Sequence, residues 1–304
     1  MVGPPRRADS TDVLKQLYRQ VFRQLPKALV GEEEPLHEMR VAARRLRVAL
    51  PLVTRKPRAK KVKRVLSLLR GLLREAGASR DLDVCTSLLA ERVKEQDPPS
   101  PTLKALLKRI RAARNRSRGR MAEGLLDLDL AGLRHGLRGC AAQGGEELFA
   151  VLQRLRGERT VRGEGLILAL ENLGERYDPE ALHEIRISCR RLRYALELAD
   201  TLKAVESGQP AVLKELQGQL GRIHDDHVVA EWLMNEGGRA GERGQVDLEI
   251  EAARQEAFFL ERGRKRHREF LDSDPKARIR TALGLGTEGS PHSQPVLGSP
   301  RVDR

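Results

Sequence analysis

Along most of the chain, apolar residues recur every three or four positions, with polar residues between them. This spacing places the apolar side chains on one face of an α-helix, where they can pack against a core. Near the start of the chain the pattern consists of Val13, Leu14, Leu17, Val21 and Leu25. Alternating runs of Val, Ile, Tyr and Phe, typical of β-strands, are scarce. The pattern predicts an all-α fold.

We expect helices where this periodicity continues between breaks rich in Gly, Pro and Asp. The expected helices cover residues 10–30, 36–53, 58–76, 82–95, 102–126, 130–142, 146–156, 164–176, 180–203, 211–221, 227–236 and 245–271. The breaks that matter below are expected at 77–81, 221–226 and 237–244. Residues 1–9 and 284–304 lack periodicity, so we expect both ends to be disordered.

One fifteen-residue segment occurs twice. LHEMRVAARRLRVAL (36–50) and LHEIRISCRRLRYAL (182–196) are identical at ten of fifteen positions and share the pattern H-x-x-R-x-x-x-R-R-L-R. A second pair, GASRDLDV (77–84) and GRIHDDHV (221–228), aligns Gly77 with Gly221 and Asp81 with Asp225. The order of expected helices also recurs. We therefore predict an internal duplication with two helical halves, residues 10–145 and 146–283.

A helical projection places four cations of each copy on one stripe, roughly 15 Å long, which borders the apolar face. The first stripe consists of His37, Arg40, Arg44 and Arg47, with Arg45 on the other flank. Its equivalent consists of His183, Arg186, Arg190 and Arg193, with Arg191 in the place of Arg45. Cys189, in the place of Ala43, is interpreted as a small buried hydrophobe.

A solvated helix face normally mixes charges of both signs, whereas these neighbours at i,i+3 and i,i+4 share one sign and repel each other. Every basic position of the stripe is Arg, whose planar guanidinium can bind two phosphate oxygens at once. The repeated stripes therefore predict a site for an anionic ligand. We expect the two histidines to donate hydrogen bonds to it, with protonation below about pH 6.5 strengthening binding.

The charge of the chain is uneven. The net charge is +14, but residues 1–150 contribute +15 and residues 151–304 contribute −1. Such a field attracts polyanions such as nucleic acid or polyphosphate. Further cations gather on helix faces and are added to the candidate site: Lys60, Lys63, Arg64, Lys108, Arg111, Arg254 and Lys265. Arg118 falls on the same helix face as Lys108 and Arg111.

With both copies of its motif, the chain resembles the CHAD family, the conserved-histidine α-helical domain. The resemblance covers roughly residues 10–275. It implies two pseudo-symmetric antiparallel four-helix bundles with a basic groove between them. It also implies binding of inorganic polyphosphate without catalysis, in the cytoplasm and on polyphosphate granules. The motif residues that it assigns to this ligand are His37, Arg40, Arg44, Arg45, Arg47, His183, Arg186, Arg190, Arg191 and Arg193.

Two other functions remain open on the sequence. HDDH (224–227) places His224 and His227 one helical turn apart beside Asp225 and Asp226, a plausible metal-ligand set for a metal-dependent phosphohydrolase that would use His224 and Asp225. The aligned residues of the first half contain no His, and no further ligands are identified. Non-specific nucleic-acid binding suits the charge, but stacking aromatic residues are few.

Cysteine content and hydropathy bound the environment. Cys85, Cys140 and Cys189 are odd in number and far apart, which argues against a disulfide framework. The start of the chain shows no apolar run of a secretory signal. No segment has the roughly 18 apolar residues needed to span a membrane. We expect a soluble intracellular protein with no cofactor, no membrane partner and no nucleic-acid partner.

Overall fold

The structure is a computed structural model that describes residues 10–98, 100–142, 147–202 and 209–285. Within these ranges it has ten α-helices and no β-strand, which confirms the all-α prediction. The helices are α1 (Ser10–Leu29), α2 (Glu33–Val53), α3 (Lys60–Lys94), α4 (Pro101–Leu126), α5 (Leu130–Ala142), α6 (Leu148–Glu171), α7 (Pro179–Thr201), α8 (Gln209–Gly241), α9 (Val246–Asp272) and α10 (Pro275–Ala282). The predictions of disorder for residues 1–9 and 286–304 lie outside the described residues.

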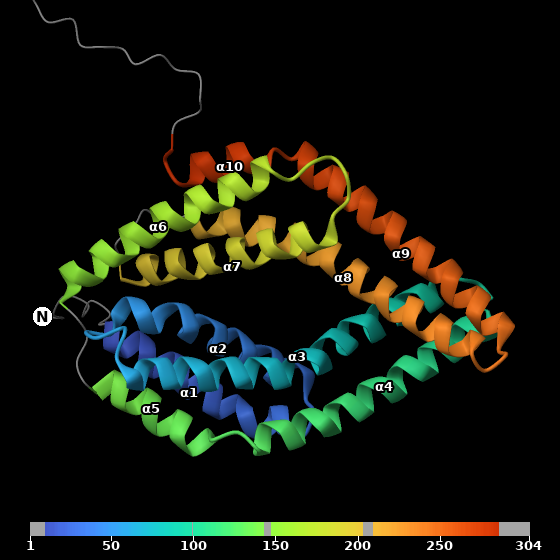
Figure 1. Cartoon of the computed structure of the whole chain (residues 1–304), viewed down its shortest axis with the longest axis horizontal. Helices are drawn as coiled ribbons and strands as arrows, with labels where there is room; N and C mark the ends of the chain where they lie inside the picture. The colour runs from blue at the N-terminus through green and yellow to red at the C-terminus, as the bar shows by residue number, and fades with distance from the viewer. Residues whose placement is uncertain (1–9, 99, 143–146, 203–208, 286–304) are drawn as a thin grey trace, which may run out of the picture.

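The helices form two lobes that meet along α2 and α7 (Figure 1). One lobe contains α1, α2, α5 and the first part of α3. The other contains α6, α7, α10 and the first part of α8. The remaining parts of α3 and α8 join α4 and α9 at one end of the molecule (Figure 1). The helices of the second half, α6–α10, are therefore arranged in the same order as α1–α5 of the first half.

Three hydrophobic cores hold this arrangement. The first fills the α1–α2–α3–α5 lobe, and Tyr194 and Leu198 of α7 also belong to it. The second fills the α6–α7–α8–α10 lobe, where Cys189 is buried as predicted. The third combines Leu89 of α3 with Leu233 of α8 and the side chains of α4 and α9 around them. Because the first and third cores contain residues from both halves, the two bundles stabilise each other.

The helix breaks predicted at 77–81 and 221–226 are wrong, because α3 and α8 run through them as helices of 35 and 33 residues. The break predicted at 237–244 begins later than expected, because α8 continues to Gly241. A glycine inside a helix costs only about 1 kcal/mol, which tertiary packing easily offsets. A Cβ atom added to Gly77 would lie 3.7 Å from Nη1 of Arg40. The separate helices predicted at 146–156 and 164–176 are likewise one helix, α6.

No helix was predicted at 275–282, where the structure has α10. Asp274 caps it by accepting a hydrogen bond from the backbone N–H of Ala277, and Pro275 follows at the first helical position. An acidic cap followed by proline is a recognised signal for a helix start, so the sequence did contain the information.

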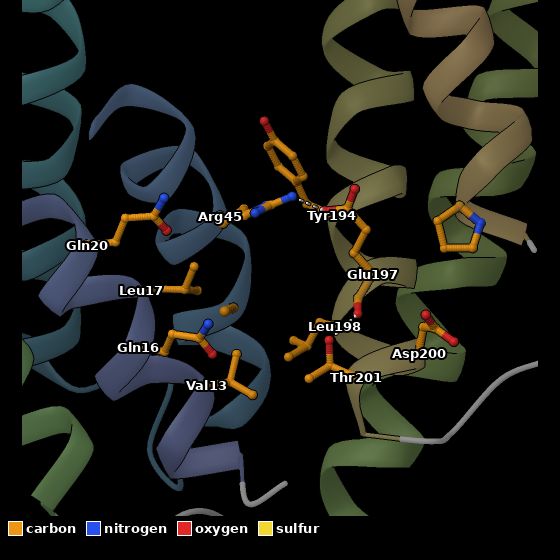
Figure 2. A pocket seen from close by; sticks show the side chains of 12 residues that line it. Val13, Gln16, Leu17, Gln20, Arg45, Tyr194, Glu197, Leu198, Asp200 and Thr201 are labelled. Atoms are coloured by element: carbon orange, nitrogen blue, oxygen red, sulfur yellow. Dashed lines mark hydrogen bonds and ion pairs between the residues drawn. The ribbon is translucent and has the colours of Figure 1, made fainter. Parts of the chain in front are cut away.

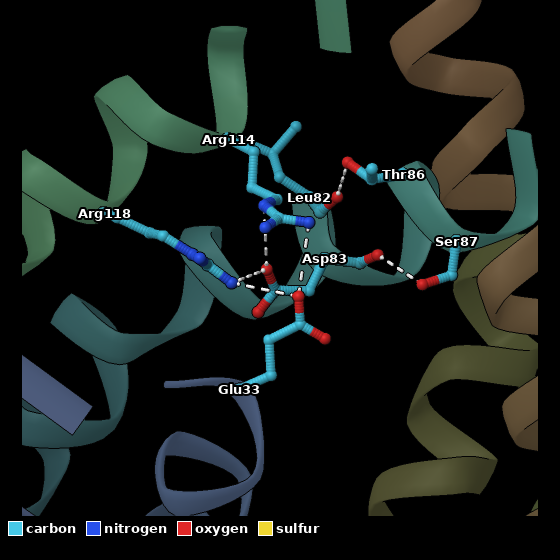
Figure 3. A network of polar contacts seen from close by, with 7 residues as sticks. All are labelled: Glu33, Leu82, Asp83, Thr86, Ser87, Arg114 and Arg118. Atoms are coloured by element: carbon cyan, nitrogen blue, oxygen red, sulfur yellow. Dashed lines mark hydrogen bonds and ion pairs between the residues drawn. The ribbon is translucent and has the colours of Figure 1, made fainter. Parts of the chain in front are cut away.

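Buried aspartates attach α4 and α9 to the long helices. Asp83 of α3 is 1% exposed and accepts a hydrogen bond from Arg118 of α4 at 2.9 Å. Glu33 pairs with Arg118 at 3.0 Å and with Arg114 at 3.2 Å, as Figure 3 shows. Arg118 therefore faces inward, and its predicted place on the basic surface with Lys108 and Arg111 is wrong.

Asp226 plays the same part in the second half. It is 0% exposed and accepts hydrogen bonds from Nε and Nη2 of Arg262 at 2.9 and 2.6 Å, and from Arg266 at 2.6 Å. Both arginines lie on α9. In each half, a buried carboxylate thus binds a pair of arginines four residues apart on the neighbouring helix.

We predict that Asp226→Asn lowers the free energy of unfolding by about 3 kcal/mol, because two partly buried arginines lose their counter-charge. Urea unfolding followed by circular dichroism measures this. The matched control is Glu261→Gln, which removes an exposed carboxylate that pairs with Arg264 and Arg268 of the same helix. We expect no measurable change there. Equal losses in the two variants would contradict the assignment.

Candidate functional site

The two histidine-arginine stripes face each other where the lobes meet. They enclose a cavity of about 330 Å³ between α2 and α3 of the first half and α7 and α8 of the second. The lining residues are His37, Arg40, Arg44, Arg80, Asp81, Val84, His183, Arg186, Arg190, His224, Asp225 and Val228. We call this space the central cavity. The repeated motif thus becomes one site with a wall from each half.

Most arginines of the central cavity have no protein partner. Arg40 donates a hydrogen bond to the carbonyl of Ala76. The other four make no hydrogen bond or ion pair with any residue in the described part of the chain: Arg44, Arg80, Arg186 and Arg190. Elsewhere in the molecule, Arg118, Arg262 and Arg266 are paired with buried carboxylates. Unpartnered guanidinium groups in a partly buried space leave their donors available to an external anion.

Asp81 and Asp225 neutralise only part of this charge. Five arginines and two aspartates leave the lining with a formal charge of +3 when its histidines are neutral. Burial raises the pKa of Asp225, against the lowering effect of Arg186 and Arg80. The cavity therefore stays electropositive, as an anion site requires.

The pKa values show that the central cavity is unfavourable for positive charge. Burial lowers the pKa of Arg190 to about 9 and that of Arg40 to about 10, and repulsion from Arg44 adds to both shifts. The pKa of Arg44 is lowered as well, again first by burial. A neighbouring anion would oppose these shifts, because it favours the charged form.

The three histidines of the cavity resist protonation. Burial, followed by repulsion from Arg186 and from His183, lowers the pKa of His224 to about 3. Burial also lowers the pKa values of His37 and His183, with further lowering from Arg80 and Arg186 respectively. Burial and the neighbouring arginines therefore work against the predicted protonation below about pH 6.5, which stays a prediction. The arginines around them were not included in that prediction.

His183 and His224 form a close pair. Their Nδ1 atoms are 3.5 Å apart and their ring centroids 4.8 Å apart. Two protonated rings at this distance would repel each other, whereas one neutral ring can accept a hydrogen bond from the other. The pair therefore binds at most one proton easily until an anion supplies a counter-charge.

Four polar lining residues were not among the predicted polyphosphate-binding residues: Arg80, Asp81, His224 and Asp225. The signal that could have found them was the second repeated segment, 77–84 and 221–228, which was interpreted as a helix break. Because α3 and α8 remain helical there, the four side chains point into the cavity.

The cationic stripe continues beyond the cavity at Arg47. Burial lowers the pKa of Arg47, and repulsion from Arg191 and Arg70 lowers it further. These three arginines come from α2, α7 and α3 and lie close enough together to interact. They add three cations outside the lining of the central cavity.

Arg45 and Arg193 do not line the central cavity. Arg45 forms an ion pair with Glu197 at 2.9 Å, and Arg193 donates to Gln217 at 2.8 Å and to Glu197. Their guanidinium carbons lie 5.6 and 4.7 Å from the ring centroid of Tyr194. Figure 2 shows Arg45 directed toward Glu197 across a separate pocket between α1, α2 and α7. Arg45 thus joins the two lobes, whereas the contacts of Arg193 lie on α7 and α8 of the second lobe.

Seven further predicted cations also lie outside the central cavity. Lys60 and Arg64 line a different cavity between α3 and α5, where Arg64 pairs with Asp129 at 2.9 Å. The others are exposed on their helices: Lys63 on α3, Lys108 and Arg111 on α4, and Arg254 and Lys265 on α9. The structure thus brings together six of the predicted residues, namely His37, Arg40, Arg44, His183, Arg186 and Arg190.

The HDDH segment is divided between two environments. His224 and Asp225 line the central cavity, whereas Asp226 is bound by Arg262 and Arg266. Across the described residues, no group of three or more His, Cys, Asp or Glu side chains is placed to hold a metal ion. In the same part of the chain, no helix is long and apolar enough to cross a membrane.

The lowered histidine pKa values predict a loss of stability in acid. A group whose pKa is lower in the folded state binds protons preferentially in the unfolded state, so stability falls as pH drops below the unfolded value of about 6.5. For His224, with a folded pKa of about 3, the loss between pH 7.5 and 5 is about 2 kcal/mol.

Urea unfolding at the two pH values checks this. We expect His224→Asn to lose markedly less stability than the wild type between pH 7.5 and 5. The control is His135→Asn, which changes an exposed histidine of α5 and should keep the wild-type acid dependence. An unchanged acid dependence in His224→Asn would contradict the buried, neutral state of His224.

Comparison with known proteins agrees with this architecture. The CHAD domain model matches residues 12–234. The structure is similar to the crystal structure of the CHAD domain from the plant Ricinus communis, with a TM-score of 0.66, 22% identity, and coverage of 94% of this chain and 95% of that one. It is also similar to PptA from Streptomyces chartreusis, with a TM-score of 0.68, 15% identity, and coverage of 87% and 100%. No curated protein matches the sequence. On the family match, the chain belongs to the CHAD domain family.

Proposed function

We propose that the protein binds inorganic polyphosphate in the central cavity and carries out no chemistry on it. The observation that carries this proposal is the set of four arginines, two from each half, that have no hydrogen bond or ion pair with any residue that the structure describes. The repeated motif also resembles a family associated with polyphosphate. Association with polyphosphate granules is part of the same proposal.

The shape of the basic region favours a linear anion. The central cavity has room for a short stretch of a polyphosphate chain. Outside it, Arg47, Arg70 and Arg191 provide further positive charge. A phosphate chain carries charge along its whole length, so it can contact both regions at once. A single small anion would use only the cavity.

The composition of the lining argues against nucleic acid at this site. Its twelve residues include no Phe, Tyr or Trp, although single-strand binders usually stack bases on aromatic side chains. The guanidinium groups can bind phosphate oxygens, but no residue there offers a platform for a base. Polyphosphate has no base, so the lack of an aromatic platform does not weaken its binding.

We predict that Arg44→Ala/Arg190→Ala weakens polyphosphate binding at least a hundredfold, because each arginine supplies charge-assisted hydrogen bonds worth about 1.5–3 kcal/mol. Isothermal titration calorimetry with polyphosphate of defined length measures this. The control is Arg19→Ala/Arg23→Ala, which removes two exposed arginines of α1 and the same net charge. Equal losses in both double variants would show that only net charge matters.

Binding is also predicted to take up protons. A bound polyanion raises the pKa values of His37, His183 and His224, which are lowered in the free protein. Affinity should therefore increase as pH falls from 8 to 6. Calorimetry in buffers of different ionisation enthalpy measures the uptake, and proton release would contradict the assignment. The wild type should take up more protons than His224→Asn.

Absence of catalysis is tested directly. With Mn²⁺, Zn²⁺ or Mg²⁺ in excess, the protein is expected to release no phosphate from polyphosphate or nucleotides. Metal-dependent release that disappears in Asp225→Asn would replace the proposal with the hydrolase alternative.

A further inference from the structure

A second basic cavity lies between α4 and the last turns of α8. It has a volume of about 790 Å³ and shares no lining residue with the central cavity. Arg116 and Arg120 of α4 form one side, Arg239 and Arg243 lie on the other, and Trp232 of α8 lies among them. We call this space the α4–α8 cavity. Its volume falls within the range of small-molecule sites.

One acid neutralises part of its charge. Glu236 pairs with Arg109 at 2.6 Å and with Arg239 at 3.3 Å. Three arginines of the α4–α8 cavity make no ion pair or hydrogen bond with the described residues, and these are Arg116, Arg120 and Arg243. All three are exposed at the cavity. Arg116 and Arg120 are four residues apart on one helix, so their guanidinium groups can bind the same anion.

Trp232 adds an aromatic surface beside these cations. It is the only tryptophan of the chain, and its side chain is partly exposed. Its ring makes no aromatic or cation–π contact among the described residues. An indole next to phosphate-binding arginines is a combination that the central cavity lacks.

We propose that the α4–α8 cavity binds a nucleotide, with the base stacked on Trp232 and the phosphates bound by Arg116, Arg120 and Arg243. Stacking on an aromatic side chain suits any base, because every base has a π face. The lining contains one aromatic residue, which suits a single nucleotide, whereas a nucleic-acid strand uses several in succession. This site does not depend on polyphosphate binding in the central cavity.

The single tryptophan makes the site directly observable. Titration of the full-length protein with ATP, excited at the red edge of tryptophan absorption, should quench Trp232 fluorescence to saturation. ATP should bind about tenfold more tightly than tripolyphosphate, which has the phosphates but no base to stack. Equal affinity for the two would overturn the stacking role and leave only a phosphate site.

Matched variants locate the binding. Arg116→Gln/Arg120→Gln should lower the affinity for ATP, measured by the quenching, about a hundredfold. The control Arg19→Gln/Arg23→Gln changes an exposed pair with the same spacing on α1 and should leave this affinity unchanged. Arg44→Ala/Arg190→Ala should also keep it, because those residues line the central cavity. Loss of quenching in that last variant, or its persistence in Arg116→Gln/Arg120→Gln, would overturn the assignment.

Calorimetry checks the base contact independently of fluorescence. In the Arg44→Ala/Arg190→Ala background, Trp232→Leu should lose about tenfold in ATP affinity and keep its affinity for tripolyphosphate. Equal losses for both ligands would indicate that Trp232 only supports the fold, and would refute stacking. Loss of polyphosphate binding at the central cavity would leave the ATP result unaffected, so the two proposals fail separately.

Discussion

The structure depends on one constraint, the repulsion among arginines of the central cavity that the described residues do not fully neutralise. Arg44, Arg80, Arg186 and Arg190 converge on one cavity with only Asp81 and Asp225 as acids. Burial first, and then repulsion from Arg44 and Arg186, lowers the pKa of Arg190 to about 9, so the arrangement is unfavourable for positive charge. Packing elsewhere in the molecule must supply the free energy that holds these residues together. An anion placed in the cavity would oppose this repulsion, because a neighbouring negative charge favours the charged form of the arginines.

Other arginines near the cavity are neutralised by carboxylates and stabilise the fold. Arg118, Arg262 and Arg266 are bound by the buried carboxylates of Asp83 and Asp226. These pairs attach α4 to α3 and α9 to α8. They lie next to the cavity-lining residues in sequence, since Asp83 follows Asp81 by two positions and Asp226 follows Asp225 directly. One face of each long helix is therefore fixed by ion pairs, and another presents its charge to the cavity.

The repeated motif also acquires unequal roles in its two copies. Arg47 remains near other arginines at the end of the stripe, whereas its counterpart Arg193 is 8% exposed and bound to Glu197 and Gln217. Arg45 of the first half shares Glu197 with it. Two positions that are equivalent in sequence thus differ: Arg47 lies near other cations, whereas Arg193 is bound within the second lobe. The two halves also differ in net charge, which is +15 for residues 1–150 and −1 for residues 151–304.

Helical periodicity and the repeat were enough to predict the all-α fold, the two motif helices and six residues of the central cavity. These features depend on spacing within one helix, which the order of residues sets directly. The continuity of α3 and α8 was not predictable in this way, because local glycine signals were outweighed by packing between distant segments. Which arginines are neutralised was also decided by the tertiary structure. Arg118 looks in sequence like Arg44 and Arg190, and only the carboxylates of Glu33 and Asp83, which other helices bring to it, make the difference.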